Sequence, residues 1–195
     1  MRVIGVTGGV GAGKSTVLSY LKEQYEARII EADVVGHEVM EPNMPAYDRI
    51  LREFGKVILD GDGKIDRKLL ASIVFADPEK LHRLNAIVHP AVKAEILRRI
   101  ECAEKQQVHL AVVEAALFLE ENYDAFCDET WYIYTDEKKR RERLKKSRGY
   151  TDERISQILK SQRSHGEFLN RCQYVIDNNG TSEETHRQID GRMRG

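Results

Sequence analysis

The sequence predicts an α/β protein built on a five-stranded parallel β-sheet. Short apolar runs rich in β-branched residues alternate with stretches of helical periodicity, which is the pattern of strand–helix–strand units. The run at residues 108–114 is apolar almost throughout, as expected for a strand that helices cover on both faces. A long stretch before that run has no strand pattern and predicts a helical insert.

Five apolar runs account for the strands of this sheet. In chain order, the predicted strands are residues 2–7, 27–31, 108–114, 130–135 and 173–177. The first helix is expected over residues 14–25, where Val17, Leu18 and Leu21 recur at helical spacing.

The insert between the second and third strands is predicted to consist of several helices separated by prolines and an Asp-Gly-Asp-Gly turn. Pro78 and Pro90 are each expected at the first position of a helix, where a missing N–H costs nothing. Residues 91–106 carry one apolar stripe and should pack against another element. Such an insert is typical of a substrate-binding subdomain; the alternative is a purely structural elaboration.

Composition and charge narrow the class of protein. The net charge is -1, so no overall basic field favours nucleic acid or an anionic membrane as a partner. No apolar run approaches the roughly 18 residues of a membrane span. The amino-terminal residues enter a strand at once, without the pattern of a signal peptide, which suggests the cytoplasm. The three cysteines are far apart in sequence and are interpreted as reduced, structural thiols.

The strongest motif lies between the first strand and the first helix. Residues 8–15 read GGVGAGKS and fit the phosphate-binding loop (P-loop) pattern G-x-x-x-x-G-K-[ST] at every position. Glycines allow the backbone to turn and to point several N–H groups at one anion, and the following helix adds positive partial charge. The pattern G-x-G-x-x-G of dinucleotide-binding folds fails, because its sixth position would be Lys14.

This motif predicts a nucleoside triphosphate ligand with Mg²⁺. Lys14 can reach the β- and γ-phosphates, and the Ser15 hydroxyl can bind the metal. The residues expected to bind ATP are Gly8, Gly11, Ala12, Gly13, Lys14, Ser15 and Thr16.

Two acidic residues follow predicted strands. In open α/β sheets, ligands bind beyond the carboxyl ends of the strands. Asp33 follows the second strand and is a candidate to orient an acceptor hydroxyl and take its proton; the equal alternative is the N-cap of a helix beginning near Val34. Glu114 ends the third strand and is expected to help hold Mg²⁺, the alternative being a hydrogen bond to another group at the site.

Residues 138–148 are dominated by lysine and arginine, and Leu144 is the one apolar residue among them. A helix that is polar all round does not bury a face, so it is either solvated or closes over something charged. Its place between the last two strands favours a kinase lid, whose arginines neutralise a transferring phosphoryl group. Nucleic-acid binding is the rival interpretation.

Together these segments resemble the dephospho-coenzyme A kinase family along nearly the whole chain. The matching stretches are GVTGGVGAGKST, EAD, LNAIVHP, EAALFLE, RGYTDERI and VIDNNG. The P-loop is generic, whereas EAD, LNAIVHP and VIDNNG in this order are far more specific. The chain differs from the common family pattern at Glu31, where Asp is frequent, and at Ala116, where Pro is frequent.

The resemblance implies a single P-loop kinase domain with a core at residues 1–35, 107–136 and 166–195. It implies an acceptor-binding insert at residues 36–106 and a lid at residues 137–165. The expected reaction is transfer of the γ-phosphoryl group of ATP, with Mg²⁺, to the 3′-hydroxyl of dephospho-coenzyme A, the last step of coenzyme A biosynthesis.

The resemblance also assigns roles to individual residues. Asp33 corresponds to the family's acceptor for the hydroxyl proton, and Arg143 and Arg148 correspond to its lid cations. The resemblance also implies that Asn178 and Gly180 lie beside the adenine of ATP and that His89 and Pro90 contact the acceptor.

Three rival functions are weighed against this one. A nucleoside or nucleotide kinase would share the same core. A GTPase would need an N-K-x-D segment after the fourth strand, where this chain has Thr135-Asp136-Glu137-Lys138 instead. A nucleic-acid binder would use the basic segment and would show strongly salt-dependent binding.

Overall fold

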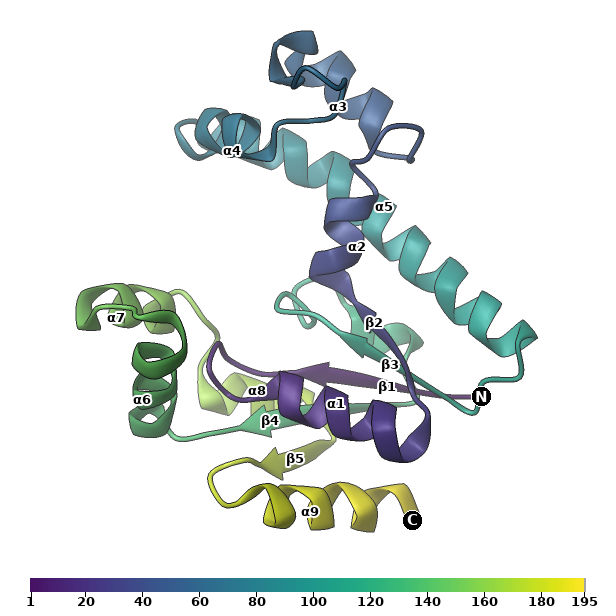
Figure 1. Cartoon of the computed structure of the whole chain (residues 1–195), viewed down its shortest axis with the longest axis vertical. Coiled ribbons are helices and arrows are strands. Elements are labelled where there is room, and N and C mark those ends of the chain that lie inside the picture. Colours follow the sequence, from purple (N-terminus) through teal and green to yellow (C-terminus); the bar gives the residue numbers. More distant parts are fainter. Residues whose placement is uncertain (195) are drawn as a thin grey trace. The chain divides into compact units, whose positions relative to one another are not determined.

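The computed structural model describes residues 1–194 and contains a five-stranded sheet in the order β2-β3-β1-β4-β5 (Figure 1). The central strand β1 runs parallel to both β3 and β4, so Val6 lies between Glu114 and Trp131. The strands are β1 (Arg2–Thr7), β2 (Arg28–Glu31), β3 (Leu110–Glu114), β4 (Glu129–Tyr134) and β5 (Tyr174–Asp177). All five predicted strands are therefore present, β1 with its predicted bounds and the others shifted by one or two residues.

The chain divides into two compact units. One comprises Met1–Ile29 and Ala103–Gly195, and the other comprises Ile30–Cys102. The second unit begins within β2 and is otherwise mainly helical. The helical insert expected at residues 36–106 falls largely within this second unit.

The core of the first unit lies between the sheet and two helices, α1 (Lys14–Tyr25) and α9 (Ser182–Arg194) (Figure 1). Alternation along β4 turns Trp131 and Ile133 toward these helices. Tyr132 points to the other face, where its ring stacks on Phe168 of α8 (His165–Arg171) with centroids 4.6 Å apart. Both faces of the sheet are thus covered, which explains why its strands are so apolar.

Two helices between β4 and β5 form the segment predicted as a lid, α6 (Glu137–Arg148) and α7 (Asp152–Lys160). Gly149 ends α6 in a left-handed conformation, and the Thr151 hydroxyl caps α7. The helix α6 is not solvated all round, because the Leu144 side chain is almost fully buried.

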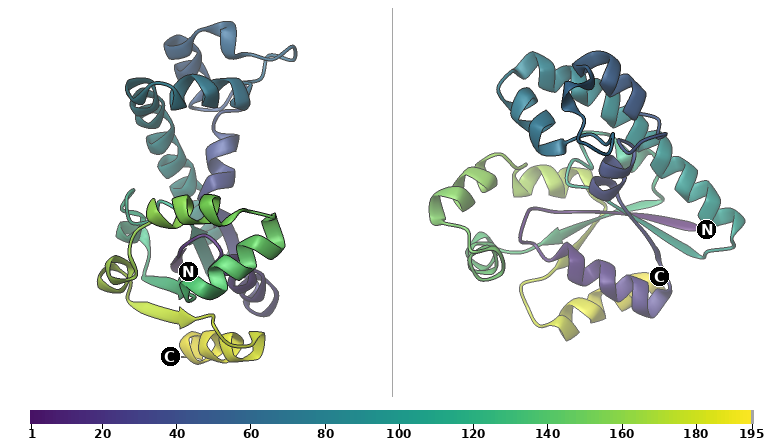
Figure 2. Two further views of the ribbon diagram at one scale, coloured as in Figure 1. Left: turned by 90° about the vertical axis from the view of Figure 1, so that its left-hand side faces the viewer. Right: turned by 45° about the horizontal axis from the view of Figure 1, so that its top comes forward.

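The second unit is built around one long helix, α5 (Pro78–Lys105) (Figure 2). The Arg83 guanidinium of α5 contacts the Glu53 carboxylate of α3 (Tyr47–Phe54) at 3.1 Å. The predicted Asp-Gly turn is present, with the Asp60 carboxylate accepting hydrogen bonds from the backbone of Asp62 and Lys64. The other helices of this unit are α2 (Ala32–Glu38), α3 (Tyr47–Phe54), α4 (Arg67–Phe75) and the 3₁₀ turn η1 (Lys56–Ile58).

The prediction that a helix begins at Pro90 is wrong. Pro78 does begin α5, behind an Asp77 carboxylate that accepts hydrogen bonds from Glu79 and Lys80, but Pro90 lies in the middle of the helix. Proline in a helix interior removes one N–H, here the donor to the Ala86 carbonyl. Buried side chains on both sides of the proline, Ile87 and Val92 among them, keep one continuous apolar face and stabilise the unbroken helix.

A short 3₁₀ turn, η2 (Tyr123–Phe126), lies between β3 and β4. Within residues 1–194, no helix is both long and apolar enough to cross a membrane.

Candidate active site

The P-loop joins the carboxyl end of β1 to the first turn of α1, as the sequence predicts. Gly13 has a φ of 88° and serves as the N-cap of α1. A Cβ atom at Gly13 would lie 2.1 Å from the Asn178 amide nitrogen, so both the backbone conformation and the close approach require glycine. Gly11 also has a left-handed φ, of 81°, and packs closely against Leu144 of α6.

The Lys14 side chain folds back over the loop. Its ammonium donates a hydrogen bond to the Gly8 carbonyl at 2.9 Å and lies 3.4 Å from a carboxylate oxygen of Glu114. The Glu114 side chain is buried at the end of β3 and the Lys14 side chain is half-buried. The fold therefore holds one positive charge beside the amides of the loop, where a bound phosphate would need it.

Ser15 and Thr16 occupy the first turn of α1, and both are exposed. The first N–H groups of a helix have no partners within the helix, so this turn presents donors and partial positive charge to an anion. With Lys14, these residues lie at the end of the loop where an anion could bind.

The outer side of the P-loop is held by polar side chains that converge on the Ala12 carbonyl. The Asn178 amide donates to this oxygen at 2.8 Å, the Thr135 hydroxyl at 2.9 Å and the Arg143 guanidinium at 3.3 Å. Arg143 also donates to the Asn178 carbonyl at 2.8 Å. Two predicted site residues, Arg143 and Asn178, thus lie against the loop. Their side chains contact it by donating hydrogen bonds to a backbone carbonyl.

A second arginine of α6, which the sequence analysis missed, also reaches the loop. The Arg140 guanidinium donates to the Val10 carbonyl at 2.9 Å and contacts the side-chain oxygen of Gln162. Burial lowers the pKa of Arg140 from its ordinary value. The signal available in the sequence was its spacing: Arg140 and Arg143 are three residues apart and so share one face of a helix.

Arg148 and Gly180 lie elsewhere. The Arg148 side chain is exposed, with its guanidinium 5.9 Å from the centre of the Tyr150 ring. Gly180 follows β5 and begins the turn into α9, and a Cβ atom there would lie 1.9 Å from a carboxylate oxygen of Glu184. A side chain at this position would therefore have to displace the Glu184 carboxylate.

Asp33 belongs to the second unit and lies in the first turn of α2. The alternative role as an N-cap is wrong, because α2 begins at Ala32 and its N-cap residue is Glu31. The Asp33 carboxylate is exposed. His89 and Pro90 are in the same unit, midway along α5, with His89 half-buried and the proline ring exposed.

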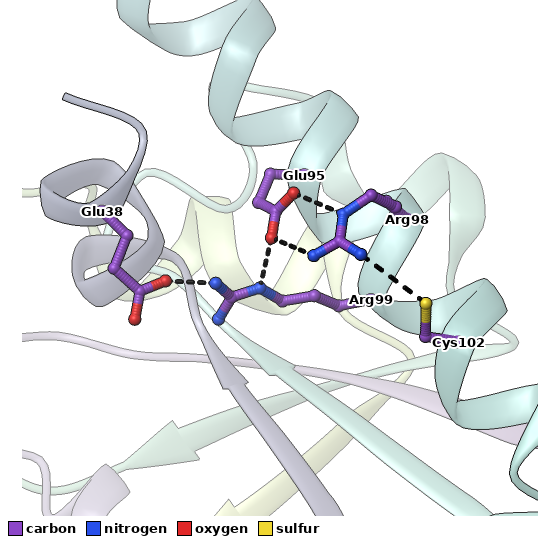
Figure 3. A network of polar contacts seen from close by, with 5 residues as sticks. All are labelled: Glu38, Glu95, Arg98, Arg99 and Cys102. Atoms are coloured by element: carbon purple, nitrogen blue, oxygen red, sulfur yellow. Dashed lines mark hydrogen bonds and ion pairs between the residues drawn. The ribbon is translucent and has the colours of Figure 1, made fainter. Parts of the chain in front are cut away.

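An ion-pair network ties the end of α2 to α5 (Figure 3). Buried Glu95 accepts hydrogen bonds from Arg98 at 2.7 and 2.8 Å and from Arg99 at 2.9 Å. Arg99 also pairs with Glu38, the last residue of α2. The hydrogen bonds from Arg98, with those from Arg99, lower the pKa of Glu95 to about 2, against the partial opposition of burial.

Comparison with known proteins finds related sequences over nearly the whole chain. A family model described as dephospho-CoA kinase matches residues 2–184. The dephospho-CoA kinase of Oceanobacillus iheyensis is 42% identical over 192 residues, covering 98% of this chain and 96% of the relative. The dephospho-CoA kinase of Geobacter sulfurreducens is 40% identical over 190 residues, covering 97% of this chain and 96% of the relative.

Solved structures of kinases share this fold. A dephospho-CoA kinase from Campylobacter jejuni superposes with a TM-score of 0.74 at 25% identity, covering 100% of this chain and 99% of that one. A shikimate kinase from Bacteroides thetaiotaomicron has the same fold, with a TM-score of 0.56 at 14% identity and coverage of 100% and 99%. Because an intact P-loop is joined to a sequence match over nearly its whole length, this chain belongs to the dephospho-CoA kinase family.

Proposed function

We propose that this enzyme transfers the γ-phosphoryl group of ATP to the 3′-hydroxyl of dephospho-coenzyme A, giving coenzyme A and ADP. The hydroxyl oxygen forms a bond to the γ-phosphorus, the bond from that phosphorus to the β–γ bridging oxygen breaks, and the hydroxyl proton passes to a base. The observation that carries the proposal is the complete P-loop at the β1–α1 junction, with Lys14 folded over it, in a member of this family. Because ATP is an intracellular substrate, we place the reaction in the cytoplasm.

The P-loop would bind the triphosphate through its backbone amides and the first turn of α1. Gly8, Gly11, Ala12 and Gly13 supply the turn, and Ser15 and Thr16 extend the donors into the helix. Lys14 lies in place to exchange its present contacts with Gly8 and Glu114 for phosphate oxygens. Its charge would then stabilise the charge that moves onto the leaving ADP.

Asp33 is the proposed base. An exposed carboxylate in the first turn of a helix can orient a hydroxyl group and accept its proton as the new bond forms. Asp33 follows the carboxyl end of β2, and ligands of open α/β sheets bind beyond such strand ends.

Ser15 and Glu114 are the proposed contacts for Mg²⁺. Their hydroxyl and carboxylate oxygens are the ligand types this ion prefers, with phosphate oxygens and water completing its shell. The buried position of Glu114, 3.4 Å from the Lys14 ammonium, suits a role through water rather than direct binding. When bound, the metal would neutralise charge on the phosphates.

The two predicted lid arginines take different roles in this proposal. Arg143 is engaged with the Ala12 and Asn178 carbonyls and would support the loop. Arg148 is exposed at the end of α6 and is the better placed to reach a phosphoryl group when the lid moves. Asn178 and Gly180 would border the adenine, and His89 and Pro90 the acceptor.

The test begins with a substrate comparison that measures ADP formation from ATP with dephospho-coenzyme A, with nucleosides or with nucleoside monophosphates. We expect turnover with dephospho-coenzyme A. An enzyme that ignores dephospho-coenzyme A and phosphorylates a nucleoside monophosphate would be a nucleotide kinase instead.

The second test concerns Asp33. We expect Asp33→Asn to slow single-turnover phosphorylation by about 10²–10⁴-fold, since that is the usual effect of removing a general base, while calorimetry shows little change in dephospho-coenzyme A binding. Asp48→Asn is the matched control, because Asp48 is also an exposed aspartate in the first turn of a helix of the same unit. An Asp33→Asn enzyme that binds poorly but transfers normally once saturated would make Asp33 a binding residue.

A further inference from the structure

We propose that Arg140 is a positioning residue for the P-loop, holding the outer side of the loop so that its amides face the nucleotide. The inference rests on the proposed binding of ATP by this loop. Arg140 lies in α6, outside the P-loop motif, and it is not one of the two arginines expected to act in the lid.

A loop that gathers an anion turns its N–H groups inward. Its carbonyl groups then point outward and need donors of their own, because an unpaired buried carbonyl is costly. In this protein, the Gly8 carbonyl accepts from Lys14 and the Gly9 carbonyl from the Ala12 amide. Among the other carbonyls of the loop, those of Val10 and Ala12 are held by donors from outside it.

The two arginines of one face of α6 supply those donors. Arg140 donates to the Val10 carbonyl at 2.9 Å and Arg143 to the Ala12 carbonyl at 3.3 Å. Thr135 and Asn178 also donate to Ala12, so the Ala12 carbonyl keeps partners if Arg143 is lost. The support of Val10 depends more heavily on Arg140.

Gln162 contacts both Arg140 and the same loop residue, Val10, that Arg140 holds. The side-chain oxygen of Gln162 accepts from the Val10 amide at 3.3 Å and also contacts the Arg140 guanidinium. The guanidinium thus joins the carbonyl of Val10 to the group that holds its amide. Both polar atoms of this peptide position are fixed by the same pair of side chains.

Gly9 shows how closely the guanidinium is fitted to the loop. A Cβ atom at Gly9 would lie 2.3 Å from an Arg140 nitrogen and 2.5 Å from its guanidinium carbon. Gly9 does not have a left-handed φ, unlike Gly11 and Gly13, so its backbone conformation is open to alanine. An alanine at this position would therefore have to displace the Arg140 guanidinium.

The first experiment measures ADP binding by calorimetry without any acceptor, in Arg140→Ala, Arg140→Lys and Lys138→Ala. We expect Arg140→Ala to raise the Kd for ADP by about tenfold or more, the range of one hydrogen bond to a charged group. Arg140→Lys should recover only part of this, because one ammonium cannot reproduce the guanidinium fork. Lys138→Ala removes an exposed positive charge from the same helix and should leave the Kd within about twofold.

The outcomes separate this inference from the proposed function. A wild-type enzyme that binds no ADP would contradict the proposed function, and a variant Arg140→Ala with wild-type affinity would contradict the positioning role. A lower Tm with an unchanged Kd would likewise show that Arg140 only stabilises the fold. If Arg140→Ala does not fold, Gln162→Ala removes the shared acceptor and should weaken ADP binding in the same direction.

A double-mutant cycle tests the link to Gly9. We expect Gly9→Ala to weaken ADP binding in the wild type by displacing Arg140, and to have little further effect in the Arg140→Ala background. Independent, multiplicative losses would mean that Gly9→Ala does not act through Arg140, and the inferred fit of the guanidinium against Gly9 would then fail.

Discussion

Lys14 illustrates how a motif residue is held ready for its ligand. Its ammonium is shared between the Gly8 carbonyl and the Glu114 carboxylate, at 2.9 and 3.4 Å. In the proposed complex, phosphate oxygens would replace both partners, and Glu114 would then face a metal-bound water. The charge is therefore kept near the site at no cost in unpaired groups.

Replacing Lys14 by alanine should lower kcat by at least about 10²-fold, the scale of losing one preorganised stabilising donor. Steady-state kinetics with saturating ATP would measure it. Lys22→Ala, an exposed lysine in the last turn of the same helix, is the control and should keep wild-type kcat. Near-normal kcat in Lys14→Ala would show that this loop is not the catalytic phosphate site.

Gly13 has both a left-handed φ and a close neighbour, so its substitution should be severe. Gly13→Ala places a methyl group against the Asn178 amide in a conformation that L-residues avoid, and we expect a loss of at least about 1–2 kcal/mol in the free energy of unfolding. Urea denaturation would measure it. Gly61→Ala is the comparison, since the space around Gly61 is open and its φ is not left-handed, and it should change stability far less.

The pair of helices α2 and α5 shows how one buried charge organises an element. Glu95 is buried on α5, yet two arginines on the next turn keep it ionised, and one of them extends to Glu38 of α2. The helix that carries Asp33 is thereby fixed at its carboxyl end. Asp33, the proposed base, would be held in place by such support.

The free energy of unfolding should depend on Glu95 in a pH-dependent way. Its pKa lies near 2 in the folded protein, below the ordinary 4.5, so the stability it contributes is full above about pH 4.5 and is lost as the pH falls toward 2. We expect Glu95→Gln to lower stability at pH 7 by about 1–2 kcal/mol, since its arginine partners are partly exposed.

Urea denaturation of wild type and Glu95→Gln at several pH values would measure this dependence, and the difference between them should shrink below pH 4.5. Glu101→Gln, an exposed glutamate on the same helix, is the control and should match the wild type throughout. A constant difference at every pH would mean that Glu95 acts through packing and not through its charge.

The whole chain consists of two compact units, and the proposed substrates divide between them. The P-loop and its supporting residues belong to the unit of Met1–Ile29 and Ala103–Gly195, whereas Asp33, His89 and Pro90 belong to Ile30–Cys102. Each ligand should therefore stabilise mainly its own unit.

Amide hydrogen exchange should show this division. We expect ADP to slow exchange in the P-loop and α6, and dephospho-coenzyme A to slow exchange in α2 and α5. A ligand at a hundred times its Kd stabilises the bound state by about 2.7 kcal/mol, enough for a roughly 100-fold effect on amides that exchange through unfolding. Protection by dephospho-coenzyme A confined to the first unit would contradict the assignment of the insert as the acceptor-binding part.

The sequence by itself determined the parallel sheet, the P-loop and the family. All three are read from local or periodic signals. The sheet follows from the apolar runs, the P-loop from the glycine spacing at a strand–helix junction, and the family from short stretches such as EAD that follow the strands. The helix start at Pro78 was also predictable, because Asp77 caps the helix through atoms adjacent in the chain.

Only the tertiary structure decided which charged residues serve the loop and where α5 begins. Sequence alone does not distinguish the arginines of α6. Packing of the helix places Arg140 and Arg143 against the backbone of the P-loop and leaves Arg148 exposed. Pro90 reads locally as a helix start, but burial of the apolar face on both sides of it outweighs one missing hydrogen bond. Contacts between residues more than a hundred positions apart, such as Arg140 with Val10, leave no periodic trace in the sequence, and so they had to be seen in the fold.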